Sequence, residues 1–407
     1  MSTELETLSK IGLLRMGETI IEKDCSGDGL PIYSADKGNR PWAYSDHFRR
    51  KNEKGSIVIG SRGTIGYPRL PKDELFGATQ TTIVFSPDKD RFIPEFLHYW
   101  LQQVDFESLG AQQAVPMLTV SNLENLTVRL FKKSEQSKIA EILSTVDQAI
   151  DQTEALITKQ QRIRIGLMQD MLTHGIDENG NIRSEDTHKF KDSSLGRIPV
   201  EWKVERGVSV CDEIVVGIVI RPTQYYREDG IPTLRSANIQ ENRIDPSHLV
   251  YMSVKDNAQL RKSQVRRGDL VTVRTGYPGA TTVIPPEFDG CNCVDIVISR
   301  PNSKKVRSQY LSIWINSYHG KLQILKGQGG LAQQHFNVSE MKNLLIKVPM
   351  LNEQERIETL LLTHAETIRK ARRNLAKLEG LKTALMQDLL TGKVSVTHLL
   401  TEADISI

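Results

Sequence analysis

The chain has few cysteines and no large excess of charge of either sign. Its four cysteines in 407 residues are too few and too scattered for a disulfide framework, and Cys291 and Cys293 lack the second pair that a zinc site needs. The 53 Lys and Arg nearly balance the 50 Asp and Glu, which excludes a polybasic nucleic-acid coat and an acidic solvating chain. A local basic surface is not excluded, because net charge averages over all faces of a protein.

Long apolar runs and a secretion signal are also missing. No segment approaches the ~18 consecutive apolar residues that cross a bilayer. The N-terminus, MSTELETLSK, has neither the basic nor the apolar region of a signal peptide. With 39% hydrophobic and 25% charged residues, the composition is typical of a soluble globular protein. We therefore expect a cytoplasmic protein that makes no membrane contact and binds no metal.

Common catalytic motifs are absent as well. The sequence has no phosphate-binding loop with the G-x-x-x-x-G-K-[ST] pattern, no H-E-x-x-H and no G-x-S-x-G. It also lacks the glycine-rich cofactor turn and the Asp/Asn-Pro-Pro-aromatic box of an adenine methyltransferase. The sequence therefore argues against an enzyme in its own right.

What the chain does contain is an internal repeat. Residues 135–172 align without a gap on residues 353–390, and about a third of the aligned positions are identical. The ends match best, with LMQDMLT beginning at Leu167 and LMQDLLT beginning at Leu385. Weaker matches continue upstream and pair Gly29 with Gly230, Gly55 with Gly268 and Trp100 with Trp314. The chain is thus one unit of ~200 residues used twice.

Each copy of the repeated block is predicted to be a long amphipathic helix. Apolar residues recur at spacings of three and four, as in a coiled coil, and each helix would be ~55–60 Å long. Gly175 and Gly392 are candidate C-terminal stops. The two helices are expected to bury their stripes against each other; the alternative is that each packs on the sheet of its own domain. The predicted seam comprises Ile139, Leu143, Val146, Ile150, Ile157, Leu167, Met171, Ile357, Leu361, Ile368, Leu375, Leu385 and Leu389.

The divergent segments before each helix are predicted to be mixed α/β domains. Each has short β-branched runs bounded by turn residues, at 56–60 and 81–85 and again at 270–273 and 296–299. The predicted order is a first domain at 1–133, a helix at 134–175, a linker at 176–196, a second domain at 197–350, a helix at 351–392 and a C-terminal tail at 393–407.

Basic turns in both domains are candidates for contact with DNA. Arg62 and Arg274 each follow a predicted strand inside a glycine-containing turn, where backbone can approach a phosphate while the side chain reaches a base edge. The alternative is an ordinary surface turn with a solvated arginine. The candidates are Arg49, Arg50, Lys51, Ser61, Arg62, Thr64, Gln112 and Gln113 in the first domain, and Arg261, Lys262, Arg266, Arg274, Thr275, Tyr277, Gln333 and Gln334 in the second.

The succession of variable domain, long helix, variable domain and long helix resembles the DNA-specificity subunit of type I restriction-modification systems. The resemblance spans essentially the whole chain. It rests on the paired helix ends at 167–175 and 385–394, on the helix starts at Glu135-Gln136 and Glu353-Gln354, and on the segment LGRIPVEW at 195–202. The first domain departs from the pattern, because no Pro-x-x-Trp segment precedes it.

This resemblance implies a fold and a set of partners. The two domains would be target-recognition domains that each read one half of a bipartite, asymmetric sequence in double-stranded DNA. The helices would form an antiparallel coiled coil that sets the spacer between the halves, giving a pseudo-twofold molecule. Two modification subunits carrying S-adenosylmethionine would dock on the helices, and two restriction subunits would supply ATP- and Mg-dependent translocation and cleavage. This chain would bind none of these cofactors itself.

Two other functions fit the same sequence. One is a coiled-coil scaffold that binds only proteins, with the divergent domains acting as peptide readers. The other is the recognition module of a methylation-only or phage-defence system that has no nuclease. DNA binding distinguishes a specificity subunit from the scaffold that binds only proteins. The sequence does not distinguish a specificity subunit from the recognition module of a system without a nuclease.

Overall fold

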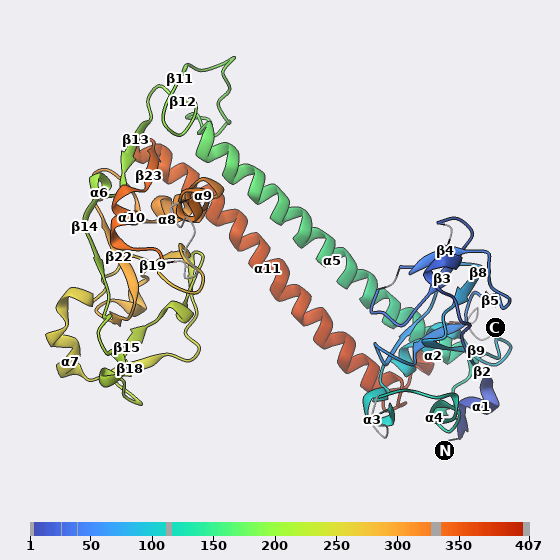
Figure 1. The fold of residues 1–407 in the computed structure, drawn as a ribbon. Helices are drawn as coiled ribbons and strands as arrows, with labels where there is room; N and C mark the ends of the chain where they lie inside the picture. The colour runs from blue at the N-terminus through green and yellow to red at the C-terminus, as the bar shows by residue number, and fades with distance from the viewer. Residues whose placement is uncertain (1–3, 26, 39, 111–115, 327–334, 402–407) are drawn as a thin grey trace. The chain divides into compact units, whose positions relative to one another are not determined.

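The computed structural model describes residues 4–25, 27–38, 40–110, 116–326 and 335–401. The chain forms two compact units: unit 1 comprises residues 1–156 together with 371–407, and unit 2 comprises residues 157–370. Both divisions fall inside the long helices α5 (Lys133–Thr173) and α11 (Leu351–Leu389), so each unit holds one mixed domain and a segment of both helices (Figure 1). Among the described helices, none is long and apolar enough to cross a membrane.

Unit 1 is built on two four-stranded sheets, with strand orders β2-β9-β6-β7 and β4-β3-β8-β5, and on the pair β1-β10. Its strands are β1 (Leu5–Thr7), β2 (Gly12–Met16), β3 (Leu30–Tyr33), β4 (Ala43–Ser45), β5 (Asn52–Glu53), β6 (Ile57–Gly60), β7 (Gly66–Arg69), β8 (Leu75–Ala78), β9 (Thr82–Pro87) and β10 (Thr127–Arg129). Its short helices are α1 (Leu8–Ile11), α2 (Pro94–Leu101), α3 (Phe106–Gly110) and α4 (Val120–Glu124).

Unit 2 repeats this plan, with the four-stranded order β14-β22-β19-β20 and the smaller sheets β18-β15-β21, β13-β23, β16-β17 and β11-β12. Its strands are β11 (Phe190–Lys191), β12 (Ile198–Pro199), β13 (Lys203–Arg206), β14 (Cys211–Val216), β15 (Ile231–Leu234), β16 (Ile239–Gln240), β17 (Arg243–Ile244), β18 (Val250–Met252), β19 (Leu270–Val273), β20 (Thr281–Val283), β21 (Asn292–Cys293), β22 (Ile296–Pro301) and β23 (Leu345–Val348). Its short helices are α6 (Gly207–Val210), α7 (Val254–Gln259), α8 (Ser308–Asn316), α9 (Tyr318–Lys326) and α10 (Val338–Asn343).

The strand registers show that the two domains are copies of one fold. In unit 1, β6 and β9 pair Ile57 with Phe85, and in unit 2 the strands β19 and β22 pair Leu270 with Ser299 at the same place. Gly55 and Gly268, which precede the equivalent strands β6 and β19, both have φ of 90°. The prediction of two mixed α/β domains in an internal repeat is therefore confirmed, although the loops between the strands differ in length and sequence.

The glutamine of the repeated Glu-Gln pair at the start of each helix makes the same contacts in both copies. Gln136 accepts a hydrogen bond from Ile93 N at 2.9 Å and donates to Phe131 O at 3.0 Å. Gln354 accepts from Arg307 N at 2.8 Å and donates to Pro349 O at 2.9 Å. Both glutamines are buried, so each must satisfy its amide within the protein. Their bonds tie the start of each long helix to the residue just before α2 or α8, which explains why the glutamine is shared by the two copies.

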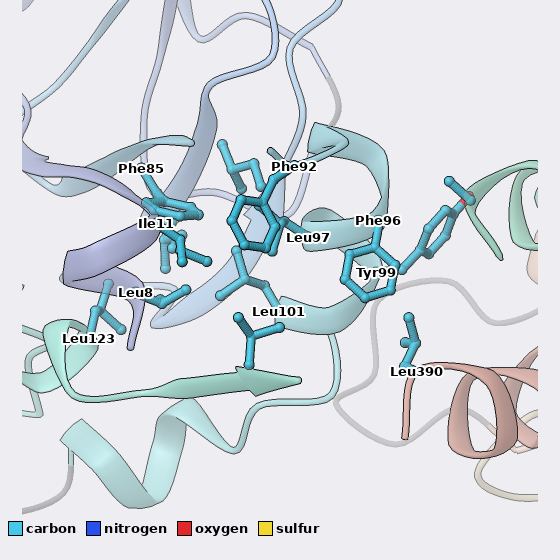
Figure 2. Packing of buried hydrophobic residues seen from close by; sticks show 14 of the residues in the cluster. Leu8, Ile11, Phe85, Phe92, Phe96, Leu97, Tyr99, Leu101, Leu123 and Leu390 are labelled. Atoms are coloured by element: carbon cyan, nitrogen blue, oxygen red, sulfur yellow. The ribbon is translucent and has the colours of Figure 1, made fainter. Parts of the chain in front are cut away.

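The core of each unit contains the end of the helix that belongs to the other repeat. In unit 1, Ile139 and Leu143 of α5 pack in one cluster with the domain and with Leu389 and Leu390 at the end of α11. Figure 2 shows Phe96 of α2 beside Leu390 in this cluster. In unit 2, the corresponding cluster combines Met171 and Leu172 of α5 with Ile357 and Leu361 of α11.

The helix segments run antiparallel within each unit, as predicted. In unit 1, Asp147 pairs with Lys382 at 2.8 Å, and the earlier residue Glu135 accepts a bond from the later Thr397 at 3.1 Å. Of the residues predicted for the seam, those near the helix ends lie in the domain cores, and the others lie along the middle of each helix. Ile139, Leu143, Ile157, Met171, Ile357, Leu361, Ile368 and Leu389 are buried, and Val146, Ile150, Leu167, Leu375 and Leu385 are half-buried.

A buried carboxylate joins the linker of unit 2 to the start of α11. Glu353 is 3% exposed and accepts hydrogen bonds from Ile176 N at 2.9 Å, from Trp202 Nε1 at 3.1 Å and from the Arg183 guanidinium at 2.5 Å. Gly175 turns the chain here with a φ of 72°, and a Cβ atom at this residue would lie 2.3 Å from Glu353 Oε1. The segment that resembles the family's domain entry is therefore held by one charged junction.

We predict that Glu353→Ala lowers the free energy of unfolding of unit 2 by about 3–5 kcal/mol, because it leaves the Arg183 charge buried without its partner. Urea denaturation followed by tryptophan fluorescence measures this loss. The matched control is Glu135→Ala, at the equivalent position of unit 1, where the carboxylate accepts bonds from Lys132 N and Thr397 Oγ1 near the surface. We expect about 1 kcal/mol there, and equal losses in the two variants would contradict the assigned role of the junction.

Candidate nucleic-acid interface

Three chain segments of each domain meet at the same end of its four-stranded sheet. In unit 2, Gly217 N donates to Ile296 O at 2.9 Å and Asp295 N donates to Ile218 O at 3.0 Å, which places the loop after β14 beside the start of β22. In unit 1, Gly17 N donates to Thr82 O at 2.9 Å in the same way. We call this the strand-end face, defined by Gly17, Ser61 and Thr81 in unit 1 and by Gly217, Arg274 and Asp295 in unit 2.

The registers also show which residues of the two faces are equivalent. Gly60 and Thr82 occupy adjacent strands in unit 1 where Val273 and Ile296 do so in unit 2. The next residue, Ser61 or Arg274, accepts a bond at 2.9 Å through its backbone oxygen, from Leu118 N or Phe336 N respectively. Arg274 is thus equivalent to Ser61, and Arg62 is equivalent to Thr275. Arg62 and Arg274 are therefore offset by one position in the equivalent segments. Because successive side chains of an extended chain point to opposite sides, the two arginines are not equivalent.

Arg62 is the more accessible of the two arginines. Its side chain is exposed, with Nε 2.8 Å from Met117 Sδ. Ser61 is buried and donates to Leu118 O at 2.6 Å, so its hydroxyl holds the turn. Thr64 is half-buried, and its backbone oxygen would lie 1.9 Å from a Cβ atom at residue 60, which therefore must be glycine.

The basic segment 49–51 is brought to the same face of unit 1 by a glutamate. Glu18, which directly follows Gly17, accepts a bond from Arg49 N at 2.8 Å and lies 3.6 Å from Arg50 Nε. The side chains of Arg49, Arg50 and Lys51 are exposed. The structure therefore gathers these three candidates near Ser61 and Arg62.

A buried arginine holds the neighbouring loop of unit 1. Arg69, on β7, is 3% exposed, and its guanidinium donates to Asp36 Oδ1 and Gly38 O, both at 3.1 Å, and to Ser34 O. Burial lowers the pKa of Arg69 below its ordinary value, and the Asp36 carboxylate acts in the opposite direction. The loop 34–38 is thus fixed from within the domain.

Arg274 is held by internal partners in unit 2. Its Nη1 donates to Asp295 Oδ1 at 2.5 Å and its Nη2 donates to Asn337 Oδ1 at 3.0 Å. Thr275 Oγ1 donates to the other carboxylate oxygen of Asp295 at 3.1 Å. These two bonds use one N–H of each Nη group and hold the guanidinium against Asp295 and Asn337.

The remaining candidates of unit 2 are spread more widely. Tyr277 is exposed, with its hydroxyl 3.3 Å from Glu241 Oε1. Arg266 precedes β19, at the strand end opposite to Arg274, and its backbone N donates to Asp269 Oδ2 at 2.9 Å. Arg261 and Lys262 are exposed on a 3-10 turn at Arg261–Ser263. Gln112, Gln113, Gln333 and Gln334 lie outside the described residues.

The sequence reasoning missed the carboxylates of the strand-end face. Glu18 and Asp295 organise the basic groups around them, and Asn337 caps α10 while accepting from Arg274. Asp295 had one available signal, because it stands beside the repeated strand where the first copy has Thr81. The Cys291 and Cys293 pair lies instead in an apolar cluster of unit 2, where burial raises the pKa of the Cys291 thiol to about 11.

Comparison with known proteins shows which family this chain resembles. Residues 3–161 match the model of the type I restriction modification DNA specificity domain. A putative type I restriction enzyme MjaX specificity subunit from Methanocaldococcus jannaschii is 24% identical, and the match covers 97% of this chain and 87% of that protein.

Two solved structures share the fold over nearly the whole chain. The S subunit of a type I restriction-modification system from M. genitalium has a TM-score of 0.61 at 16% identity, covering 96% of each chain. A chain from a study of complex assembly and conformational transition of the type I restriction-modification system has a TM-score of 0.58 at 17% identity, covering 96% of this chain and 98% of its own.

These matches support a specificity subunit of a type I restriction-modification system. The family model covers the first domain and most of α5, and the second domain has the equivalent strand order in its four-stranded sheet. A specificity subunit is the non-catalytic member of its system.

We predict different effects for the two arginines. Arg62→Ala should leave the melting temperature unchanged and reduce discrimination at one base position by about 1–3 kcal/mol, because the exposed side chain is free to reach a base edge. Arg274→Ala should lower the free energy of unfolding by about 1–3 kcal/mol, because it removes the donors that satisfy Asp295 and Asn337. Thermal denaturation and mobility shift of the assembled complex measure both effects. An unchanged melting temperature for Arg274→Ala would show that its internal bonds are dispensable.

Proposed function

We propose that this specificity subunit selects the DNA target of a type I restriction-modification complex, with each unit reading one half of a bipartite, asymmetric sequence. The proposal rests on one observation: both units have the same strand-end face, but the side chains on it differ. Where unit 1 has Ser61 and Thr81, unit 2 has Arg274 and Asp295. One scaffold with two sets of reading groups fits two half-sites of different sequence, because base identity is read by side chains at the groove edges.

We further propose that the helix pair sets the spacer between the half-sites. Both α5 and α11 are continuous across the division between the units, and the ends of each are buried in the domain cores. A helix anchored at both ends cannot change its length without breaking backbone hydrogen bonds. This supports a fixed distance between the two reading groups.

The helix surfaces also support docking of the modification subunits. Leu156 and Leu381 in unit 1, and Ile163 and Ile165 in unit 2, are apolar helix residues that are between 37% and 59% exposed. Unit 1 also has a groove of about 1180 Å³ between α2, α3 and both helices, lined by Asp147, Asp151, Glu379 and Lys382 among others. Exposed apolar residues beside a polar groove are typical of a protein-binding surface.

The complete complex in this proposal has two modification subunits and two restriction subunits on one specificity subunit. S-adenosylmethionine would be held by the modification subunits, and ATP and Mg by the restriction subunits. Since the target is cellular DNA, we place the complex in the cytoplasm.

The proposed function is tested by co-expressing the chain with its modification subunits and sequencing the methylome of the host. We expect methylated adenines in one bipartite motif with two different halves. Mobility-shift assays with and without the modification subunits provide the control. If neither condition shows DNA binding and no motif appears, the chain is a protein-binding scaffold.

The spacer role is tested by lengthening both helices. Insertion of four residues after Leu156 and four after Lys370 adds ~6 Å to each helix, which corresponds to about two base pairs at ~3.4 Å each. We expect the methylated motif to gain spacer length while both halves keep their sequences. A motif with the original spacer would contradict the spacer role of the helices.

A further inference from the structure

A single carboxylate occupies the centre of the strand-end face of unit 2. Asp295 Oδ1 accepts from Arg274 Nη1 at 2.5 Å and Oδ2 accepts from Thr275 Oγ1 at 3.1 Å. Its side chain is 36% exposed. A carboxylate has about four acceptor positions, so these two bonds orient Asp295 and leave lone pairs facing solvent.

The backbone of Asp295 is held in a conformation that few residues adopt. Its φ is 53°, in the left-handed region, which costs a non-glycine residue free energy. The hydrogen bond from Asp295 N to Ile218 O at 3.0 Å fixes this conformation. Aspartate is one of the few non-glycine residues that this region accepts, so the turn can hold a carboxylate here.

The negative charge of Asp295 limits what this carboxylate can contact on DNA. DNA phosphates repel carboxylates, so an acidic side chain on a DNA-reading face weakens binding unless it contacts a donor. Arg274 offsets part of this repulsion by pairing with Asp295. Among base edges in the major groove, the exocyclic amino group of cytosine is the donor that Asp and Glu accept from.

We propose that Asp295 determines the specificity of unit 2 by accepting a hydrogen bond from the N4 amino group of a cytosine in its half-site. Arg274 and Thr275 act as positioning residues that orient the carboxylate. The inference rests on the proposed DNA-reading function and names the base that this face selects.

The neighbouring loop carries an exposed apolar residue. Ile220 is 75% exposed and lies two residues after Ile218, whose backbone is bonded to Asp295. Arg221 follows with a φ of 43°, in the left-handed region. DNA seated on the face would cover Ile220 and exclude water from the Asp295 contact, which strengthens a charge-assisted hydrogen bond.

Unit 1 does not have this group at the equivalent position. Thr81 Oγ1 lies 2.7 Å from Thr79 Oγ1 and 3.1 Å from Ser34 Oγ, and it accepts from Ala35 N at 3.3 Å. Its hydroxyl is therefore engaged within the domain. The cytosine contact belongs to one half of the target only, as an asymmetric sequence requires.

The experiment compares Asp295→Asn with the wild-type chain, each assembled with its modification subunits, by methylome sequencing. We expect one position in one half of the motif to lose its cytosine preference by about tenfold or more, with adenine gaining, because Asn pairs with the adenine edge. The other half should not change. The matched control is Glu213→Gln, which breaks another arginine–carboxylate pair of the same sheet, with Arg300, and should leave the motif intact.

A DNA analogue makes the test independent of the folding of the variant. Replacing the identified cytosine by pyrimidin-2-one removes its amino group, and we expect wild-type binding to weaken about tenfold while the binding of Asp295→Asn is unaffected. Equal weakening of both proteins by the analogue overturns the proposal, as does a variant that loses affinity uniformly or keeps its motif. If the wild-type complex methylates no bipartite motif at all, the proposed function fails instead.

Discussion

The structure depends on apolar helix ends that complete the core of the opposite repeat. Leu389 and Leu390 at the end of α11 pack with the domain of the first copy, and Met171 and Leu172 at the end of α5 pack with the domain of the second. The core of unit 1 therefore needs residues more than 200 positions away in the chain, and the core of unit 2 joins residues up to 190 positions apart. Neither domain with its own helix alone would bury the apolar surface that the intact chain buries, which couples the stability of both units to the helix pair.

This arrangement explains why the helices repeat closely while the domains diverge. The Glu-Gln pair at each helix start makes equivalent backbone contacts in both copies through Gln136 and Gln354, and the LMQD motif places its apolar residues in both cores. Any change there disturbs burial and hydrogen bonding at once. The loops at the strand ends are not constrained in this way, because surface loops tolerate changes of sequence. Side chains such as Arg62 and Asp295 can therefore differ between the copies.

Carboxylates on the strand-end faces reconcile the small net charge with a DNA-reading function. Glu18 holds the segment with Arg49 and Arg50, Asp36 pairs with Arg69, and Asp295 pairs with Arg274. These carboxylates fix the orientation of the arginine side chains. The formal net charge of +3 sums over such pairs. The individual side chains on each face, rather than the net charge of the chain, decide what that face can bind.

The sequence by itself determined the repeat, the two long helices and the mixed character of both domains, because helical periodicity and β-branched runs are local properties of the chain. It also identified Arg62 and Arg274 as residues that follow strands. Only the tertiary structure decided that these arginines are not equivalent, since their register depends on pairing with β9 and β22, and that Arg274 is bound to Asp295 and Asn337. Contacts between residues distant in the chain are set by strand register and by burial, and neither leaves a periodic pattern in the sequence.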